Sequence, residues 1–197
     1  DTQHVQVSAT GDTSTYLSIL DQEGDLAVAV NDMRVIDQID VQRLKTHSKL
    51  LGAAAVVVAD ANLKAESLKY LATHSPTVPL FIDAVSSVKA PRLRSILDRI
   101  HTLKMSRDEA LAACTSQGKT PDNLHQLAGW FRDRGVQRVF ITAGAEGMFV
   151  STAEHHEHVA AAQITQTGNT SGAGDALLAG LVYAWISDLD VAESIRF

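Results

Sequence analysis

The sequence contains a single cysteine, Cys114, among 197 residues. One cysteine excludes an intrachain disulfide and every cysteine-rich metal site, and it is typical of a reducing compartment. We therefore expect a cytoplasmic protein. An excess of basic residues is also lacking, because 17 Lys and Arg face 23 Asp and Glu, for a net charge of −6. Since a nucleic-acid backbone is bound by a basic face, this balance argues against a nucleic-acid polymer as partner.

Long hydrophobic runs are absent as well. No apolar stretch approaches the roughly 20 residues that a membrane helix needs. Residues 1–5 have neither the basic nor the apolar region of a signal peptide. We therefore expect a soluble protein without a membrane partner. Aromatic residues make up only 5% of the chain, yet 45% of its residues are hydrophobic. That content is enough to bury a substantial core.

Short apolar strands alternate with helical patterns along most of the chain. The first two strands, 14–20 and 26–31, flank a polar turn and predict a hairpin. From residue 41 onward, helices are expected at 41–51, 65–74, 92–100, 108–113 and from Thr120-Pro121 to Gly135, and strands at 54–59, 78–82, 102–104 and 138–142. This alternation indicates an α/β fold with a mostly parallel sheet, whose ligands gather at the carboxyl ends of the strands.

The most informative motif is residues 169–175, Asn-Thr-Ser-Gly-Ala-Gly-Asp, directly followed by the apolar helix pattern 176–186. A glycine-rich turn that opens a helix presents free backbone N–H groups and the positive end of the helix dipole, which together bind anions such as phosphate. The carboxylate of Asp175 would repel a phosphate, so its presence suggests that it faces an attacking hydroxyl. The alternative is an ordinary turn, because Asp is also a favoured helix-capping residue.

A second glycine motif, Thr-Ala-Gly-Ala-Glu-Gly at 142–147, follows the strand 138–142. It is either a ligand loop at the carboxyl edge of the sheet or the turn of a simple hairpin. Ser106 and Glu109 have the spacing of a helix capping box. Asp83 follows the predicted strand 78–82 and suits either a phosphate-side or magnesium-side role or a polar strand terminus. Lys89 and Lys104 are expected to be surface cations, and the alternative is that they meet the phosphates of a nucleotide.

The two glycine motifs together resemble the ribokinase/PfkB family of carbohydrate and nucleoside kinases. Residues 169–182 fit that family's C-terminal signature, and residues 142–147 are similar to its nucleotide loop. Shorter stretches resemble the pseudouridine kinase branch most closely; they lie at 15–21, 30–33, 58–62, 82–86 and 100–104. The resemblance implies a ribokinase-like three-layer fold, α/β, with a mostly parallel central sheet and a small β lid.

The resemblance also implies an enzyme, a phosphotransferase that uses ATP and Mg²⁺ to phosphorylate the 5′-hydroxyl of a ribosyl substrate. Pseudouridine is the expected small-molecule substrate, and ribokinase-like or adenosine-kinase-like substrates are the alternatives. Asp175 then corresponds to the catalytic base. The amides of Gly172, Ala173 and Gly174 correspond to the anion hole, and ATP is held by Thr142, Gly144 and Gly147.

Further roles follow from the same resemblance. Ser106 and Glu109 occupy the magnesium and phosphate network, where the family usually has Asn in place of Ser106; Glu109 is expected to contact Mg²⁺ through water. Asn169 and Ser171 occupy positions that bind a monovalent cation such as K⁺. The hairpin corresponds to the lid, through which a homodimer is expected, and the substrate-contacting residues on it are Thr15, Asn31 and Asp32.

Two domains are expected from the resemblance. Residues 1–36 form part of the β lid, with the N-terminal part of the family domain absent, including its Gly-Gly-x-x-x-Asn segment that grips the sugar. Residues 37–197 form the α/β nucleotide-binding kinase core, with its C-terminal end absent. The missing sugar segment and Ser106 favour a competing hypothesis, a non-catalytic nucleoside- or nucleotide-binding module, whereas Asp175 disfavours it.

Overall fold

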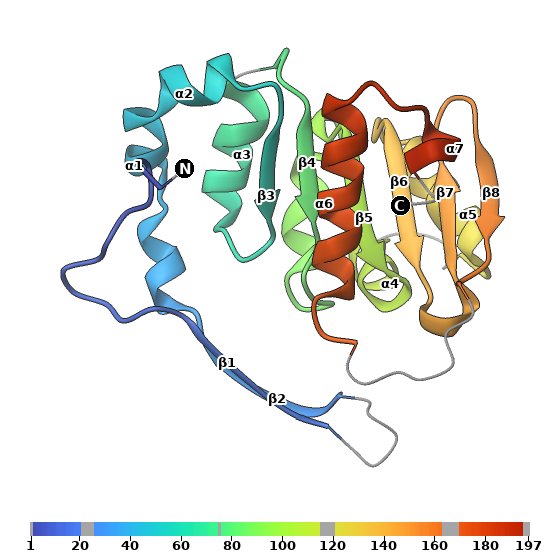
Figure 1. Cartoon of the computed structure of the whole chain (residues 1–197), viewed down its shortest axis with the longest axis horizontal. Helices are drawn as coiled ribbons and strands as arrows, with labels where there is room; N and C mark the ends of the chain where they lie inside the picture. The colour runs from blue at the N-terminus through green and yellow to red at the C-terminus, as the bar shows by residue number, and fades with distance from the viewer. Residues whose placement is uncertain (1, 21–25, 75, 115–120, 163–169, 195–197) are drawn as a thin grey trace.

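The computed structural model describes residues 2–20, 26–74, 76–114, 121–162 and 170–194 (Figure 1). In this part of the chain, one sheet has six strands in the order β3-β4-β5-β6-β7-β8. Strands β3 to β6 are parallel, and β7 and β8 extend the sheet in antiparallel orientation. The strands are β3 (Val57–Asp60), β4 (Leu80–Asp83), β5 (Thr102–Ser106), β6 (Arg138–Thr142), β7 (Met148–Ser151) and β8 (His156–Val159). The predicted, mostly parallel sheet is confirmed.

Helices cover both faces of this sheet, which gives three layers (Figure 1). One face carries α3 (Ala65–His74), α4 (Arg107–Cys114), α5 (Leu124–Arg132) and the 3₁₀ turns η2 (Ala90–Ser95) and η3 (Leu97–Arg99). The other face carries α6 (Ala173–Ile186) and α7 (Val191–Ser194). Three short helices lie beside β3: η1 (Arg34–Gln38), α1 (Val41–Thr46) and α2 (Ser48–Ala53).

Neighbouring residues of β4 belong to two separate hydrophobic cores, one on each face of the sheet. Ile82 of β4 belongs to the core that includes Leu68 of α3 and Phe131 of α5. The preceding residue, Phe81, belongs to the core that includes Leu178 of α6. Successive strand residues point to opposite faces, so an unbroken apolar run can serve both layers. Each fully buried side chain of this size contributes about 2 kcal/mol, so the two cores fix where α6 lies on the sheet.

The hairpin forms a separate two-stranded antiparallel sheet, β1 (Thr15–Leu20) and β2 (Leu26–Asp32), that projects away from the core (Figure 1). Cross-strand partners are Leu17 with Val30 and Ile19 with Val28. These four side chains share one face and are 53–64% exposed.

Three of the helices predicted between residues 41 and 135 differ from the structure. The helix predicted at 41–51 is divided at His47 into α1 and α2, and the one predicted at 92–100 is two 3₁₀ turns separated at Ile96. Helix α5 begins at Leu124 rather than at Pro121, because the Asn123 side chain accepts a hydrogen bond from the Gln126 N–H and so caps the helix there. Thr120, the predicted cap, lies outside the described residues.

The longest described helix, α6, has 14 residues. Among the described residues, none of the helices has the length and apolar character needed to span a bilayer.

Candidate anion and hydroxyl site

Strands β3, β4 and β5 end side by side at one edge of the sheet, and helix α6 begins at that same edge (Figure 1). In register, Asp60 lies beside Asp83, and Asp83 lies beside Lys104. A cavity of about 1000 Å³ opens here. Its polar lining consists of Asp60, Asn62, Asp83, Lys104, Gly172, Gly174 and Asp175. The structure therefore brings the predicted glycine turn and Asp175 to a ligand-sized cavity at the edge where α/β proteins bind ligands.

The glycine turn runs directly into α6, which begins at Ala173, three residues earlier than predicted. Gly172 is the N-cap and has a φ of 82°, a left-handed conformation that glycine adopts without strain. The Ala173 N–H donates to the Thr170 carbonyl at 3.2 Å, so this amide is used inside the turn. Within the described part of the chain, the amides of Gly174 and Asp175 have no acceptor. These amides lie at the positive end of the helix dipole and can receive an anion.

Asp175 is exposed in the first turn of α6 and lines the cavity. A carboxylate there can accept a proton or a hydrogen bond from a hydroxyl group that enters the cavity. Of the two predicted cation-binding positions, Ser171 is exposed just before α6, and Asn169 lies outside the described residues.

Lys104 is not the surface cation that the sequence predicted. Its residue exposure is 7%, and its Nζ donates to Asp83 Oδ2 at 2.9 Å. The other oxygen, Asp83 Oδ1, accepts from the Val85 N–H at 2.9 Å. The sequence did hold a signal for this pair: Lys104 lies between Leu103 and Met105 in an apolar strand, one strand away from an aspartate. A lysine in a buried strand requires a partner, and the parallel register supplies it.

The other predicted surface cation, Lys89, is partly buried. Its Nζ donates to Asn62 Oδ1 at 2.5 Å, and Asn62 in turn donates to both carboxylate oxygens of Asp60. This chain of hydrogen bonds ties the loop after β3 to the segment before η2. Lys89 itself does not line the cavity.

Ser106 and Glu109 form the capping box at the start of α4. The Ser106 N–H donates to Glu109 Oε2 at 2.8 Å, and the Glu109 N–H donates to Ser106 Oγ at 3.3 Å. Ser106 is also the register neighbour of Thr142 at the ends of β5 and β6, and Thr142 Oγ1 donates to the Met105 carbonyl at 3.4 Å. The predicted Ser106, Glu109 and Thr142 side chains are therefore clustered at the sheet edge, although none of them lines the cavity.

The second glycine motif is the turn between the antiparallel strands β6 and β7, a geometry that leaves its predicted role as a ligand loop open. It includes the short 3₁₀ turn η4 (Gly144–Glu146). Arg107 at the start of α4 binds Glu146 at 2.6 Å, which connects this turn to the capping box. Gly144 is exposed, whereas Gly147 is buried, and a Cβ there would lie 2.1 Å from the Val159 carbonyl. Packing against β8 is thus a sufficient reason for glycine at 147.

The predicted substrate contacts on the hairpin, Thr15, Asn31 and Asp32, are exposed, and none of them lines the cavity around Asp175. Asp32 is engaged by Arg34, whose Nε donates to both carboxylate oxygens at 2.9 and 3.1 Å. These hydrogen bonds from Arg34 lower the pKa of Asp32 to about 2. Asp32 is therefore ionised at neutral pH and already paired.

The cavity edge suits the phosphates of a nucleotide. Free amides at the helix terminus and the Lys104 ammonium supply donors and positive charge for an anion. The described residues contain no group of three or more His, Cys, Asp or Glu side chains that could hold a metal ion by themselves. Magnesium bound to ATP needs only one or two carboxylates, because the phosphates and water complete its octahedron. The donors at this edge are therefore compatible with a magnesium nucleotide.

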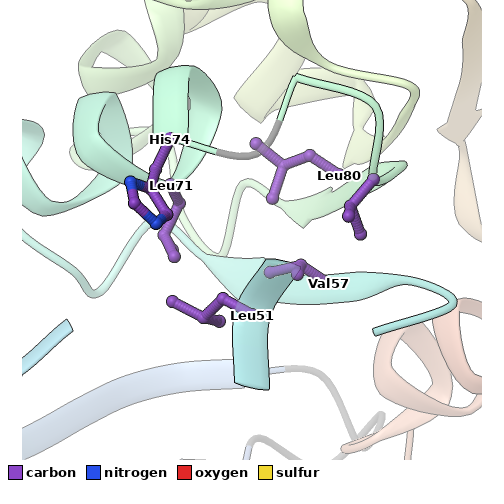
Figure 2. Close-up of a pocket in the computed structure, with 6 residues that line it drawn as sticks. Leu51, Val57, Leu71, His74 and Leu80 are labelled. Atoms are coloured by element: carbon purple, nitrogen blue, oxygen red, sulfur yellow. The ribbon is translucent and has the colours of Figure 1, made fainter. Parts of the chain in front are cut away.

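A second, much smaller pocket is lined by apolar side chains of α2, β3, α3 and β4 (Figure 2). Leu51, Val57, Leu71 and Leu80 surround it, and His74 lies at one side. Its volume is about 10 Å³, which corresponds to one water molecule at most. This pocket is a packing gap and offers no room for a substrate.

The three layers and the mostly parallel sheet, with the glycine turn at its carboxyl edge, define a protein of the α/β class. This chain belongs to the pfkB family of carbohydrate kinases, whose family model matches residues 1–197. It is 36% identical over 187 residues to pseudouridine kinase of Escherichia coli (strain K12), and the match covers 94% of this chain and 59% of the relative.

Solved structures agree with this family. A carbohydrate kinase from Agrobacterium tumefaciens is 25% identical, with a TM-score of 0.76 over 95% of this chain and 60% of that chain. Adenosine kinase from Anopheles gambiae, at 16% identity, has the same fold with a TM-score of 0.83 over 97% of this chain and 62% of its own. The predicted ribokinase-like fold is confirmed. The chain spans about three fifths of the length of each of these relatives.

Proposed function

We propose that this chain carries the phosphoryl-transfer core of an ATP-dependent kinase. The observation that carries the proposal is the first turn of α6, where acceptor-free amides of Gly174 and Asp175 and the Asp175 carboxylate face one cavity. An anion-binding turn beside a carboxylate suits a reaction in which a hydroxyl attacks a phosphoryl group. Membership of a carbohydrate kinase family supports the same reaction.

In this proposal, the amides of the glycine turn donate hydrogen bonds to oxygens of the transferring phosphoryl group. The first turn of α6 adds the positive end of its dipole, which stabilises negative charge that develops there. Asp175 accepts the hydrogen bond of the substrate hydroxyl, orients it, and takes its proton as the oxygen bonds to phosphorus. ATP would supply the phosphoryl group and leave as ADP when the bond between the γ-phosphorus and its bridging oxygen breaks, and Mg²⁺ would neutralise part of the phosphate charge.

The nucleotide side is assigned to the neighbouring turn and capping box. Thr142, Gly144 and Gly147 belong to the turn expected to hold ATP. Ser106 lies beside Thr142 in the sheet, and one carboxylate oxygen of Glu109 is used in the capping box, which leaves Oε1 to reach a magnesium-bound water. A monovalent cation such as K⁺ at Asn169 and Ser171 is part of the same proposal.

The proposed acceptor is the 5′-hydroxyl of a ribosyl group, and pseudouridine is the first candidate. The 36% identity with the Escherichia coli pseudouridine kinase supports this choice. A panel of pseudouridine, uridine, adenosine, ribose and fructose 6-phosphate tests it against the ribokinase-like and adenosine-kinase-like alternatives. Pseudouridine should give the highest kcat/KM, and a preference for any other member of the panel contradicts the assignment.

Residues 1–36, which include the hairpin, are proposed as part of a lid for the core of residues 37–197. The exposed apolar face of the hairpin is proposed as the contact with a second copy of the protein.

A cytoplasmic location is also part of the proposal. The single thiol, Cys114, is free and buried in the core, and burial raises its pKa. A buried thiol of this kind packs as a small hydrophobic side chain and is unreactive.

The test uses the full-length parent protein with Mg²⁺, ATP and the substrate panel. Asp175→Asn should lower ADP release by at least about 1000-fold while ATP still binds. Asp188→Asn, just after the C-cap of the same helix, is the control and should keep the parent rate. Turnover of Asp175→Asn at the parent rate contradicts the role of Asp175. A parent protein that binds nucleoside or ATP but never releases ADP favours the non-catalytic binding module instead. One observation that suits this alternative is that the predicted lid contacts do not line the cavity.

A further inference from the structure

Lys104 lies directly beneath the glycine turn of α6. A Cβ placed on Gly174 would lie 2.2 Å from Lys104 Nζ and 3.0 Å from Lys104 Cε. The end of a lysine side chain usually moves away from such a contact at little cost. Here it is 7% exposed and bonded to the 6% exposed Asp83 at 2.9 Å, so displacing it would break a buried ion pair. The absence of a side chain at Gly174 is what lets the ammonium reach this position.

The ammonium also faces the cavity. Lys104, Asp83, Gly174 and Asp175 all belong to its lining. Among the described residues, the Lys104 ammonium makes one hydrogen bond, to Asp83. A lysine ammonium has three N–H donors, so two are left for a ligand. They lie beside the turn whose Gly174 and Asp175 amides have no acceptor.

We propose that Lys104 is a phosphoryl-binding residue of this site, positioned by Asp83, and that it supplies an ammonium group to the anion turn. An entering phosphoryl oxygen accepts hydrogen bonds from the turn amides and from Lys104 Nζ together. The proposal rests on the proposed phosphoryl transfer and deepens it. It also assigns Gly174 a specific role, because any side chain there would displace the ammonium.

The competing explanation is that the ion pair between Lys104 and Asp83 serves only the stability of the fold. A double variant that replaces both charged residues by neutral ones distinguishes this explanation from phosphoryl binding. Lys104→Met and Asp83→Asn alone each leave a buried charge without its partner, so both single variants should melt at clearly lower temperature than the parent. The double variant Asp83→Asn/Lys104→Met removes both charges at similar volume and should recover most of the melting temperature. Its ADP release, measured in the full-length parent, should remain about 100-fold below the parent.

Recovery of both stability and turnover in the double variant overturns the proposal, because the pair would then be structural only. Lys89→Met is the matched control, since Lys89 is bonded to Asn62 and does not line the cavity; it should keep the parent turnover. A loss of turnover in Lys89→Met as large as that in the double variant also overturns the proposal, because the effect would not be specific to Lys104.

A measurement on the unmodified protein keeps the proposal testable if the double variant fails to fold. The ¹⁵Nζ signal of a buried lysine ammonium can be followed by NMR while inorganic tripolyphosphate is added. A saturable shift of the Lys104 signal is expected, and an unchanged signal at saturation overturns the proposal. This readout does not require turnover. A shift in a protein that releases no ADP therefore contradicts the kinase proposal alone, whereas normal ADP release without a shift contradicts Lys104 alone.

Discussion

Ser106 and Glu109 cap each other's backbone at the start of α4, with hydrogen bonds of 2.8 and 3.3 Å. This geometry gives Glu109 a structural role besides the proposed role near magnesium. Glu109→Ala removes the cap and should lower the free energy of unfolding by about 1 kcal/mol. Glu109→Gln keeps the cap, because glutamine also forms capping boxes, but loses the negative charge.

We therefore expect Glu109→Gln to melt within a few degrees of the parent protein while its magnesium-dependent ADP release falls at least about tenfold. Thermal melts and a magnesium titration of ADP release measure the two effects separately. Glu109→Ala, which loses both the cap and the charge, is the comparison. A Glu109→Gln variant with the parent's magnesium dependence would show that Glu109 serves only the helix cap.

Gly147 is expected to be far less tolerant of substitution than Gly129. Gly147 has a φ of 92°, and an added Cβ would meet the Val159 carbonyl at 2.1 Å, so Gly147→Ala should cost at least about 2 kcal/mol of unfolding free energy. Gly129 lies inside α5 with no heavy atom within 4 Å of an added Cβ. Gly129→Ala should instead stabilise the protein by about 0.5–1 kcal/mol. Chemical denaturation of both variants checks the contrast, and equal costs contradict it.

The exposed face of the hairpin is expected to hold two copies of the protein together. Leu17 and Val30 are cross-strand partners, 64% and 63% exposed. Replacing both by Thr keeps the preference for strand structure but removes apolar area, so the mass measured by light scattering should fall from dimer to monomer. Ser18→Thr, on the opposite face, should leave the mass unchanged. A monomeric parent protein contradicts the lid-mediated dimer.

Stability should decrease below about pH 6.5 because of His101. This imidazole lies 5.3 Å from the Phe81 ring and 4.3 Å from the Trp185 ring, and burial, followed by the nearby Arg138, lowers its pKa to about 4. The unfolded chain takes up this proton near pH 6.5 while the folded chain resists it, so stability is lost as the pH falls from about 6.5 toward 4 and is unaffected above that window.

The comparison is between the parent protein and His101→Gln, melted at pH 7.5 and at pH 5. Removing His101 should shrink the loss of unfolding free energy between the two pH values by about 1 kcal/mol, after a discount for solvent screening of the partly exposed ring. An identical pH dependence of the two proteins would show that His101 does not carry this effect.

The alternation of apolar strands and amphipathic helices was enough to predict the layers of the core. Strand β6 and helix α3 lie at the predicted residues, because their hydrophobic periods and end signals agree. Helix starts were harder, as α5 shows: several residues before it can cap a helix, and only local geometry selected Asn123. The segment 92–100 has helical periodicity but forms 3₁₀ turns, in which Arg92 binds the carbonyls of Ala61 and Asn62.

By itself, the sequence determined the α/β class, the glycine turn before α6 and the candidate role of Asp175, because these depend on residue type and on spacing along one segment. The burial of Lys104 had a sequence signal in its apolar strand, but tertiary structure alone decided that its partner is Asp83 and that it lies under Gly174. That contact joins β4, β5 and α6, and the register between strands distant in sequence is set by packing of the whole sheet. Local pattern cannot report which side chains meet across such distances, so the charge beneath the turn became visible only in the folded chain.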